Sequence, residues 1–350
     1  MQQVASKAII LYLCNQLIAY SMKLFFKTIF LLAIAVVFAL HSFGQFNGGG
    51  NYWKKHKTEY YATLGVTSFL GELGGRNKIG SDFIWDFELN QTRWAGNVGI
   101  RHFFRKDLAI RGNFMFGYLA GNDNLTEEPF RKKRNLHFRS FVMEASGLLE
   151  YNFRKGSTGN QYSISGSNRA RAAFRESIYS AFIGVGVLKF KPKARYHEEW
   201  FDLRAFGTEG QNLGAPGNQY SLYTVVVPIG INYRRSVSER INVSIEISHR
   251  FSFTDYIDDV STEYYNQQEI TLFSGEEAAY LADPSFEFLV IDGEQIFSDN
   301  TLPGLQRGDP NDNDSYLTLT VGANYKLNTN KFKRRRKFVG TKAKRRRLNF

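Results

Sequence analysis

Apolar and polar residues alternate along eight segments of this 350-residue chain. In the clearest segment, 241–248, Ile241, Val243, Ile245 and Ile247 share one face and polar residues occupy the other. Such a period of two indicates a β-strand, because successive side chains of a strand point to opposite faces of the sheet. The eight predicted strands are Glu59–Leu70, Trp94–Phe104, Leu108–Ala120, Leu136–Phe153, Ile178–Phe190, Tyr223–Arg235, Ile241–Ser248 and Tyr316–Leu327.

Alternating strands build either a soluble sandwich with one wet face or a transmembrane barrel with lipid outside. The connections and the strand ends favour the barrel. The connections after Phe104 and Arg235 are short, that at 154–177 is moderate and the other four are long. Short turns on one rim and long loops on the other are typical of outer-membrane barrels. Aromatic residues also gather near the strand ends, where an interfacial girdle belongs. They are Tyr60, Trp94, Phe104, Tyr118, Tyr151, Tyr179, Tyr223, Tyr233 and Tyr325.

The polar face of the predicted strands carries ionisable residues of both signs. An eight-stranded barrel has an interior that side chains just fill, so opposite charges are expected to pair there, whereas a sandwich would leave them in solvent. The predicted fold is therefore all-β: an eight-stranded antiparallel transmembrane β-barrel in the cell outer membrane, with long extracellular loops and a disordered basic C-terminal tail. The expected interior charge network comprises Arg101, Arg111, Glu144, Glu150, Arg234 and Glu246, and Arg250 shares their face.

The final predicted strand resembles the assembly signal of outer-membrane barrels. In Thr320–Leu327 a polar residue is followed at set spacing by Gly322, the aromatic Tyr325 and the hydrophobic Leu327. The signal falls on the eighth strand, as expected for the last strand of a barrel. This position adds weight to the barrel over the sandwich.

The N-terminal region has the features of an export signal. Lys23 and Lys27 precede an apolar stretch at 28–40, which is too short to span a bilayer convincingly, and the small residues Ser42 and Gly44 suit a cleavage site. The expected organisation is a signal peptide at 1–44 with Met22 as initiator, a periplasmic segment at 45–58, the outer-membrane barrel at 59–328 and a basic periplasmic tail at 329–350.

Net charge is concentrated at the ends of the chain. The formal charge is +12, of which residues 331–350 contribute +11 and residues 1–44 contribute +3, leaving about −2 for the remainder. An even number of strands places both ends of the barrel in the periplasm, so nucleic acid is not an expected partner. The tail is either a run of like charges kept extended by self-repulsion or a docking segment for an acidic periplasmic protein or anionic lipid. Its candidate docking residues are Lys333, Arg334, Arg335, Arg336, Lys337, Lys344, Arg345, Arg346 and Arg347.

The sequence offers no catalytic, cofactor or metal site. His197-Glu198-Glu199 is expected to be a solvated part of the loop 191–222, and Gly184 and Gly186 are expected to relieve crowding within a strand. The acidic run 309–314 could supply oxygen ligands to Ca²⁺, but it lacks the glycine and distal glutamate of an EF-hand. We therefore expect a non-enzymatic protein, whose long loop 254–315 packs over the barrel mouth or faces an external partner.

Two short motifs resemble a family of outer-membrane β-barrels from Bacteroidota that includes the PorG-like component of type IX secretion and gliding machinery. They are Gly71-Glu72-Leu73-Gly74 at the end of the first strand, and Gly121-Asn122-Asp123 after an arginine-bearing strand. The resemblance covers mainly residues 59–153. It implies an anchor or scaffold that contacts periplasmic secretion-ring proteins, with outer-membrane lipid around it. The alternative is a small barrel that binds or passes a small ligand.

Overall fold

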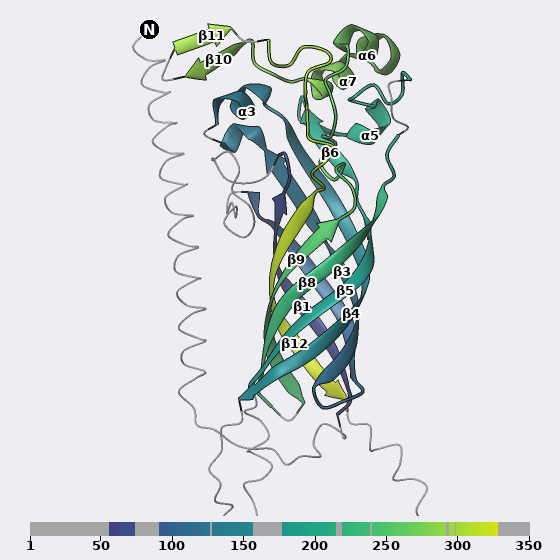
Figure 1. Ribbon diagram of the computed structural model, residues 1–350, viewed down its shortest axis with the longest axis vertical. Coiled ribbons are helices and arrows are strands. Elements are labelled where there is room, and N and C mark those ends of the chain that lie inside the picture. Colours follow the sequence, from purple (N-terminus) through teal and green to yellow (C-terminus); the bar gives the residue numbers. More distant parts are fainter. Residues whose placement is uncertain are drawn as a thin grey trace, which may run out of the picture.

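Eight antiparallel strands close into a barrel (Figure 1). The computed structural model describes residues 56–73, 91–126, 128–156, 177–214, 219–238, 240–291, 294–297 and 299–327. The barrel strands are β1 (Thr58–Leu70), β2 (Arg93–Phe103), β3 (Leu108–Asn122), β4 (His137–Gly156), β5 (Ser177–Lys189), β8 (Tyr223–Ser236), β9 (Ile241–Ser252) and β12 (Ser315–Leu327). The sheet closes where β1 pairs with β12, from Thr58 opposite Leu327 to Leu70 opposite Ser315. This closure confirms the predicted barrel and excludes the sandwich.

The two ends of the barrel differ. At the turn end, β2 and β3 join through a tight turn in which the Arg105 N–H donates to the Leu108 carbonyl at 3.2 Å. The turn between β8 and β9 is equally tight, with the Val237 N–H donating to the Ile241 carbonyl at 3.0 Å. Figure 1 shows that the opposite, loop end carries the helices and the short strands. The elements of this end are η3 (Asp123–Leu125), α3 (Pro129–Arg134), β6 (Pro192–Tyr196), β7 (Glu199–Asp202), α5 (Leu203–Phe206), α6 (Gln267–Ser274), α7 (Glu276–Ala282), β10 (Phe288–Ile291) and β11 (Glu294–Phe297).

The loops 190–222 and 253–314 form a folded cap over the barrel mouth. Ile257 and Leu281 of the cap belong to the same buried apolar cluster as Phe69 and Val142 of the barrel strands. The expectation that the long loop packs over the mouth is therefore confirmed. The free energy that holds the cap comes mainly from this apolar burial, at about 25 cal/mol per Å².

The loop 190–222 is more ordered than the sequence suggested. Its strands β6 and β7 pair with each other, and β6 extends the barrel wall by pairing with β4 at Arg139 and Ser140. His197 and Glu198 form the exposed turn of this hairpin, both with positive φ (41° and 76°). The expected solvated polar segment is thus a hairpin turn.

The glycines of β5 allow two strands to approach closely. A Cβ atom on Gly184 would lie 2.2 Å from the carbonyl oxygen of Gly147 on β4 and 2.5 Å from a methyl carbon of Leu148. Only a residue without a side chain fits there, because the barrel wall is sharply curved. The interpretation of this glycine as relief of crowding is confirmed.

No helix in the described part of the chain is long and apolar enough to cross a membrane. The predicted signal peptide at 1–44, most of the segment 45–58 and the basic tail at 329–350 lie outside the described residues.

Candidate functional site

The turn-end half of the barrel interior holds three arginines and three glutamates in one connected network. Arg101 on β2 donates from Nε to Glu150 at 2.9 Å and from Nη1 to Glu59 at 3.0 Å. Arg234 on β8 reaches the same two carboxylates, at 3.0 Å to Glu59 and 2.8 Å to Glu150. All four side chains are at most 4% exposed. With the two remaining members, Arg111 and Glu246, the charges of the network cancel.

Arg111 and Glu246 join opposite walls of the barrel. Their atoms Nη1 and Oε2 lie 2.9 Å apart. Arg111 is on β3 and Glu246 on β9, which are four places apart in the closed order of eight strands. The Arg111 guanidinium also lies 4.7 Å from the centre of the Tyr61 ring. The contact therefore crosses the middle of the lumen.

A second polar group crosses the lumen nearer the loop end. Arg250 on β9 donates to Glu144 on β4 at 2.6 Å. The Tyr316 hydroxyl on β12 donates to the same carboxylate at 3.0 Å, from the strand opposite β4. Five of the six predicted interior charges thus lie in the first network, and Glu144 lies in this separate group.

Glu59 is the network member that the sequence analysis missed. It is the first residue of the predicted strand and shares the inward face with Tyr61 and Thr63. Strand parity could have identified it, because every second residue of β1 points into the lumen.

Beyond Glu144 the interior is mainly apolar, with a few buried hydroxyls such as those of Thr67 and Ser140. Inward-facing side chains here belong to the same buried cluster as the cap. They include Phe69, Met115, Leu119, Val142, Leu188 and Val226. The sequence analysis expected paired charges inside the barrel and did not foresee this apolar part, which forms because the cap supplies apolar partners.

The outer wall of the barrel is apolar and exposed. Its central belt includes Leu64, which is 70% exposed, and many further aliphatic residues. They include Val98, Ile100, Ile110, Leu149, Ile183, Val185, Val187, Val225, Ile229, Ile231, Ile247 and Val321. Burying eight charged side chains while exposing this belt is favourable only when hydrocarbon surrounds the wall. The protein is an integral outer-membrane β-barrel.

Aromatic girdles bound the belt at both ends. Tyr60 pairs with Tyr325 near the turn end, and both side chains are nearly half exposed. Near the loop end, Trp94 packs edge-on against Tyr118 with ring centres 5.7 Å apart, and Tyr118 lies 5.1 Å from Phe141. Amphipathic rings are favoured at the two membrane–water interfaces. Because short turns of such barrels face the periplasm, the turn end is periplasmic and the cap is external.

Comparisons with known proteins give only distant likenesses. No family model and no curated protein sequence matches the chain. Among solved structures it is similar to Neisserial surface protein A, with 7% identity, 77% of this chain and 97% of that chain covered, and a TM-score of 0.31. It is also similar to Ail of Yersinia pestis in complex with a heparin analogue, with 9% identity, 77% of this chain and 99% of that chain covered, and a TM-score of 0.30. For the outer-membrane protease OmpT of Escherichia coli the identity is 9%, the coverage is 78% of this chain and 97% of that chain, and the TM-score is 0.19. TM-scores of this size carry no argument, and the membrane assignment rests on the two faces of the barrel wall.

A buried polar cluster fastens the two cap loops to each other. Arg307 donates from Nη1 to Glu209 at 2.9 Å, and the Thr208 and Tyr220 hydroxyls both donate to Asp259 at 2.5 Å. Burial raises the pKa of Asp259 to about 6, although the nearby Arg307 lowers it. Burial also raises the pKa of Tyr220 well above its usual value, which keeps its hydroxyl proton available for this hydrogen bond. Both carboxylates of the cluster accept hydrogen bonds from donors within the cap, which suits a structural role.

The acidic run 309–314 is divided by the fold. Asp309, Asn311 and Asp312 are exposed, whereas Asp314 is 1% exposed and points beneath the cap. The candidate docking residues of the tail lie outside the described residues, so their contacts stay a prediction.

Proposed function

We propose that this protein is a non-enzymatic anchor or scaffold that holds a periplasmic assembly at the outer membrane, as part of type IX secretion or gliding machinery. The basic tail and the short motifs that resemble those of the Bacteroidota barrel family support the periplasmic side of this proposal. The described chain ends with Leu327 of β12 at the turn end, and the short turns of outer-membrane barrels face the periplasm, which supports a periplasmic tail. Its eleven positive charges suit an acidic protein surface or anionic headgroups.

One observation carries the choice of an anchor over a passage for solutes. Side chains from opposite strands meet inside the barrel at two levels, Arg111 with Glu246 and Tyr316 with Glu144. The apolar cluster and the cap then fill the external mouth. Opening a water path would require breaking ion pairs between buried charges, which costs several kcal/mol for each charge left unpaired.

The first test is electrical. Purified full-length protein inserted into a planar bilayer is expected to show no stepwise conductance, because the lumen is crossed at both levels. The double variant Arg111→Ser/Tyr316→Ser, which removes one side chain from each crossing, provides the sensitised comparison. Stepwise conductance of the wild-type protein would contradict the anchor and favour the small-ligand barrel.

The second test concerns the tail. Deleting residues 331–350 is expected to leave membrane insertion intact and to remove periplasmic proteins that crosslink to the wild-type chain in intact cells. A matched control replaces the eleven lysines and arginines of the tail with glutamines and preserves its length. If the same partners are retrieved with both altered tails, electrostatic docking by the tail is excluded.

A further inference from the structure

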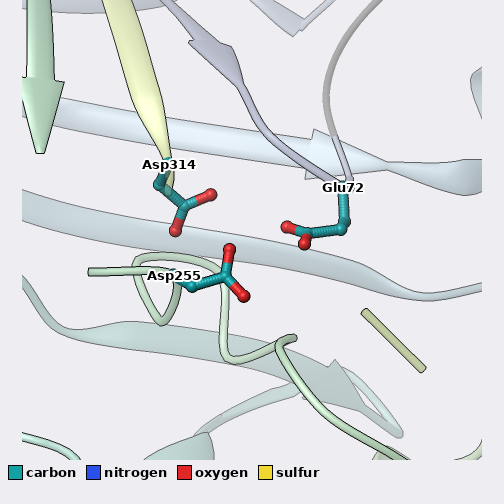
Figure 2. Close-up of side chains that lie close together, drawn as sticks. All are labelled: Glu72, Asp255 and Asp314. Atoms are coloured by element: carbon teal, nitrogen blue, oxygen red, sulfur yellow. The ribbon is translucent and has the colours of Figure 1, made fainter. Parts of the chain in front are cut away.

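Three carboxylates converge under the cap, at the rim where adjacent strands end. Glu72 follows β1, Asp255 follows β9 and Asp314 precedes β12 (Figure 2). These strands are neighbours in the barrel wall, in the order β1, β12, β9. One oxygen of each carboxylate lies within 4.8 Å of the corresponding oxygens of the other two.

The backbone orients two of these carboxylates so that one oxygen of each remains free. The Asp309 N–H donates to Oε1 of Glu72 at 3.0 Å, and the Ile257 N–H donates to Oδ2 of Asp314 at 2.8 Å. The other oxygens, Oε2 of Glu72 and Oδ1 of Asp314, are buried and accept no hydrogen bond from any residue that the structure describes. Gly71 leaves room for the latter, since a Cβ there would lie 2.3 Å from it.

Asp255 is the strongest indication of a missing ligand. Asp255 is 5% exposed, and neither of its carboxylate oxygens has a hydrogen bond of good geometry to any described residue, although the Ser261 side chain lies near enough to lower the Asp255 pKa. Figure 2 shows this carboxylate directed between Glu72 and Asp314. Leaving a buried carboxylate without a donor or counter-ion costs several kcal/mol, so four free oxygens in one place call for a cation or for protons.

The two nearest arginines in the described part of the chain, Arg134 and Arg307, have other partners. The Arg134 guanidinium on α3 donates to Asp123 at 2.7 Å and to the Glu72 carbonyl at 3.0 Å, and Arg307 is paired with Glu209. Asp258 adds a further carboxyl, whose oxygens accept from the N–H groups of Leu73 and Val260. Among the described residues the cluster therefore gathers four acidic groups with no cation of its own, and burial together with Glu72 raises the pKa of Asp255 to about 9.

We propose that Glu72, Asp255 and Asp314 bind one Ca²⁺ ion that ties the external ends of β1, β9 and β12 together. All the free ligand atoms are carboxylate oxygens, which hard cations prefer. The three oxygens lie within 4.8 Å of one another, close enough to share one ion. Ca²⁺ accepts irregular oxygen coordination, whereas Mg²⁺ demands a near-ideal octahedron and keeps most of its waters, so an all-carboxylate cluster favours Ca²⁺. Water completes the coordination, and the ion replaces the protons that the acidic groups otherwise hold.

Direct binding tests this site. Full-length protein refolded without lipopolysaccharide in non-ionic detergent and treated with EDTA is dialysed against ⁴⁵Ca²⁺ at constant ionic strength. We expect one ion to bind per chain with a Kd of about 10⁻⁴–10⁻³ M, the range of extracellular sites, and more weakly bound Mg²⁺. The double variant D255N/D314N is expected to lose this binding by more than about tenfold, whereas D312N, at an exposed acid of the same segment, retains it.

Folding of the variants is checked by the gel mobility of unheated samples. As a second readout, Ca²⁺ is expected to protect the wild-type cap from proteolysis, and to have no such effect on D255N/D314N. A wild-type chain that binds no Ca²⁺, or a double variant that binds it as tightly as D312N, would overturn the proposal. Stabilisation of the cap by both asparagines with no effect of Ca²⁺ on the wild type would identify a proton-sharing cluster instead. Ca²⁺ binding and protection of the cap from proteolysis do not depend on the tail or on periplasmic partners. The test of the calcium site is therefore separate from that of the proposed function.

Discussion

Replacing Arg234 with glutamine is expected to destabilise the barrel by about 3–5 kcal/mol, the cost of leaving a buried charge without its partner. Arg234 donates to Glu59, Glu150 and Asn152 inside the lumen and is 0% exposed. Its loss leaves three glutamates facing two arginines in a space without bulk water. The measurement is the free energy of unfolding in urea, with the protein folded into lipid vesicles.

The control is Arg240→Gln in the exposed turn between β8 and β9, expected to change stability by less than about 0.5 kcal/mol. The double variant Glu59→Gln with Arg234→Gln restores neutrality, so it should be more stable than the sum of the single losses predicts, by about 0.5–3 kcal/mol. If Arg234→Gln costs no more than Arg240→Gln, the lumen is hydrated and the network contributes little.

Placing a charge on the outer belt is expected to destabilise the barrel nearly as much as Arg234→Gln does. Leu64 lies at the middle of β1 and points outward, so Leu64→Arg would put a guanidinium against hydrocarbon near the bilayer midplane. The expected cost is about 2–4 kcal/mol, measured as folding into vesicles. The reduced insertion would appear on gels as loss of the fast-migrating folded band.

Two comparisons separate lipid contact from general damage. Leu64→Phe keeps the position apolar and is expected to fold normally. Leu302→Arg places the same charge on an exposed residue of the cap and is expected to leave stability unchanged. Equal stability of Leu64→Arg and Leu302→Arg in vesicles would show that lipid does not contact this wall.

The anchor and the calcium site are compatible because they concern opposite ends of the molecule. The cap and its acidic cluster face outward, whereas the ends of β1 and β12 face the periplasm. The proposed anchor needs no route through the lumen between them, whose charges are paired and whose external half is packed with apolar side chains.

The sequence by itself determined the local structure of this protein. Alternation along each segment gave the eight strands, the face of each that turns inward and the girdle residues, because a period of two is a property of one strand alone. It also placed Arg101, Arg111, Glu150 and Arg234 on the inner face. The even number of strands predicted that the first and last strands of the barrel begin and end on the same side of the membrane.

Only the tertiary structure decided which residues meet. Arg111 and Glu246 face each other because barrel closure and strand register bring β3 opposite β9. Closure and register cannot be inferred from the sequence of a single strand. Glu72, Asp255 and Asp314 converge because β1, β9 and β12 end at one rim, although long loops separate the three residues in the chain. The apolar half of the lumen likewise depends on the cap that covers it, since burial is decided by the partner and not by the strand.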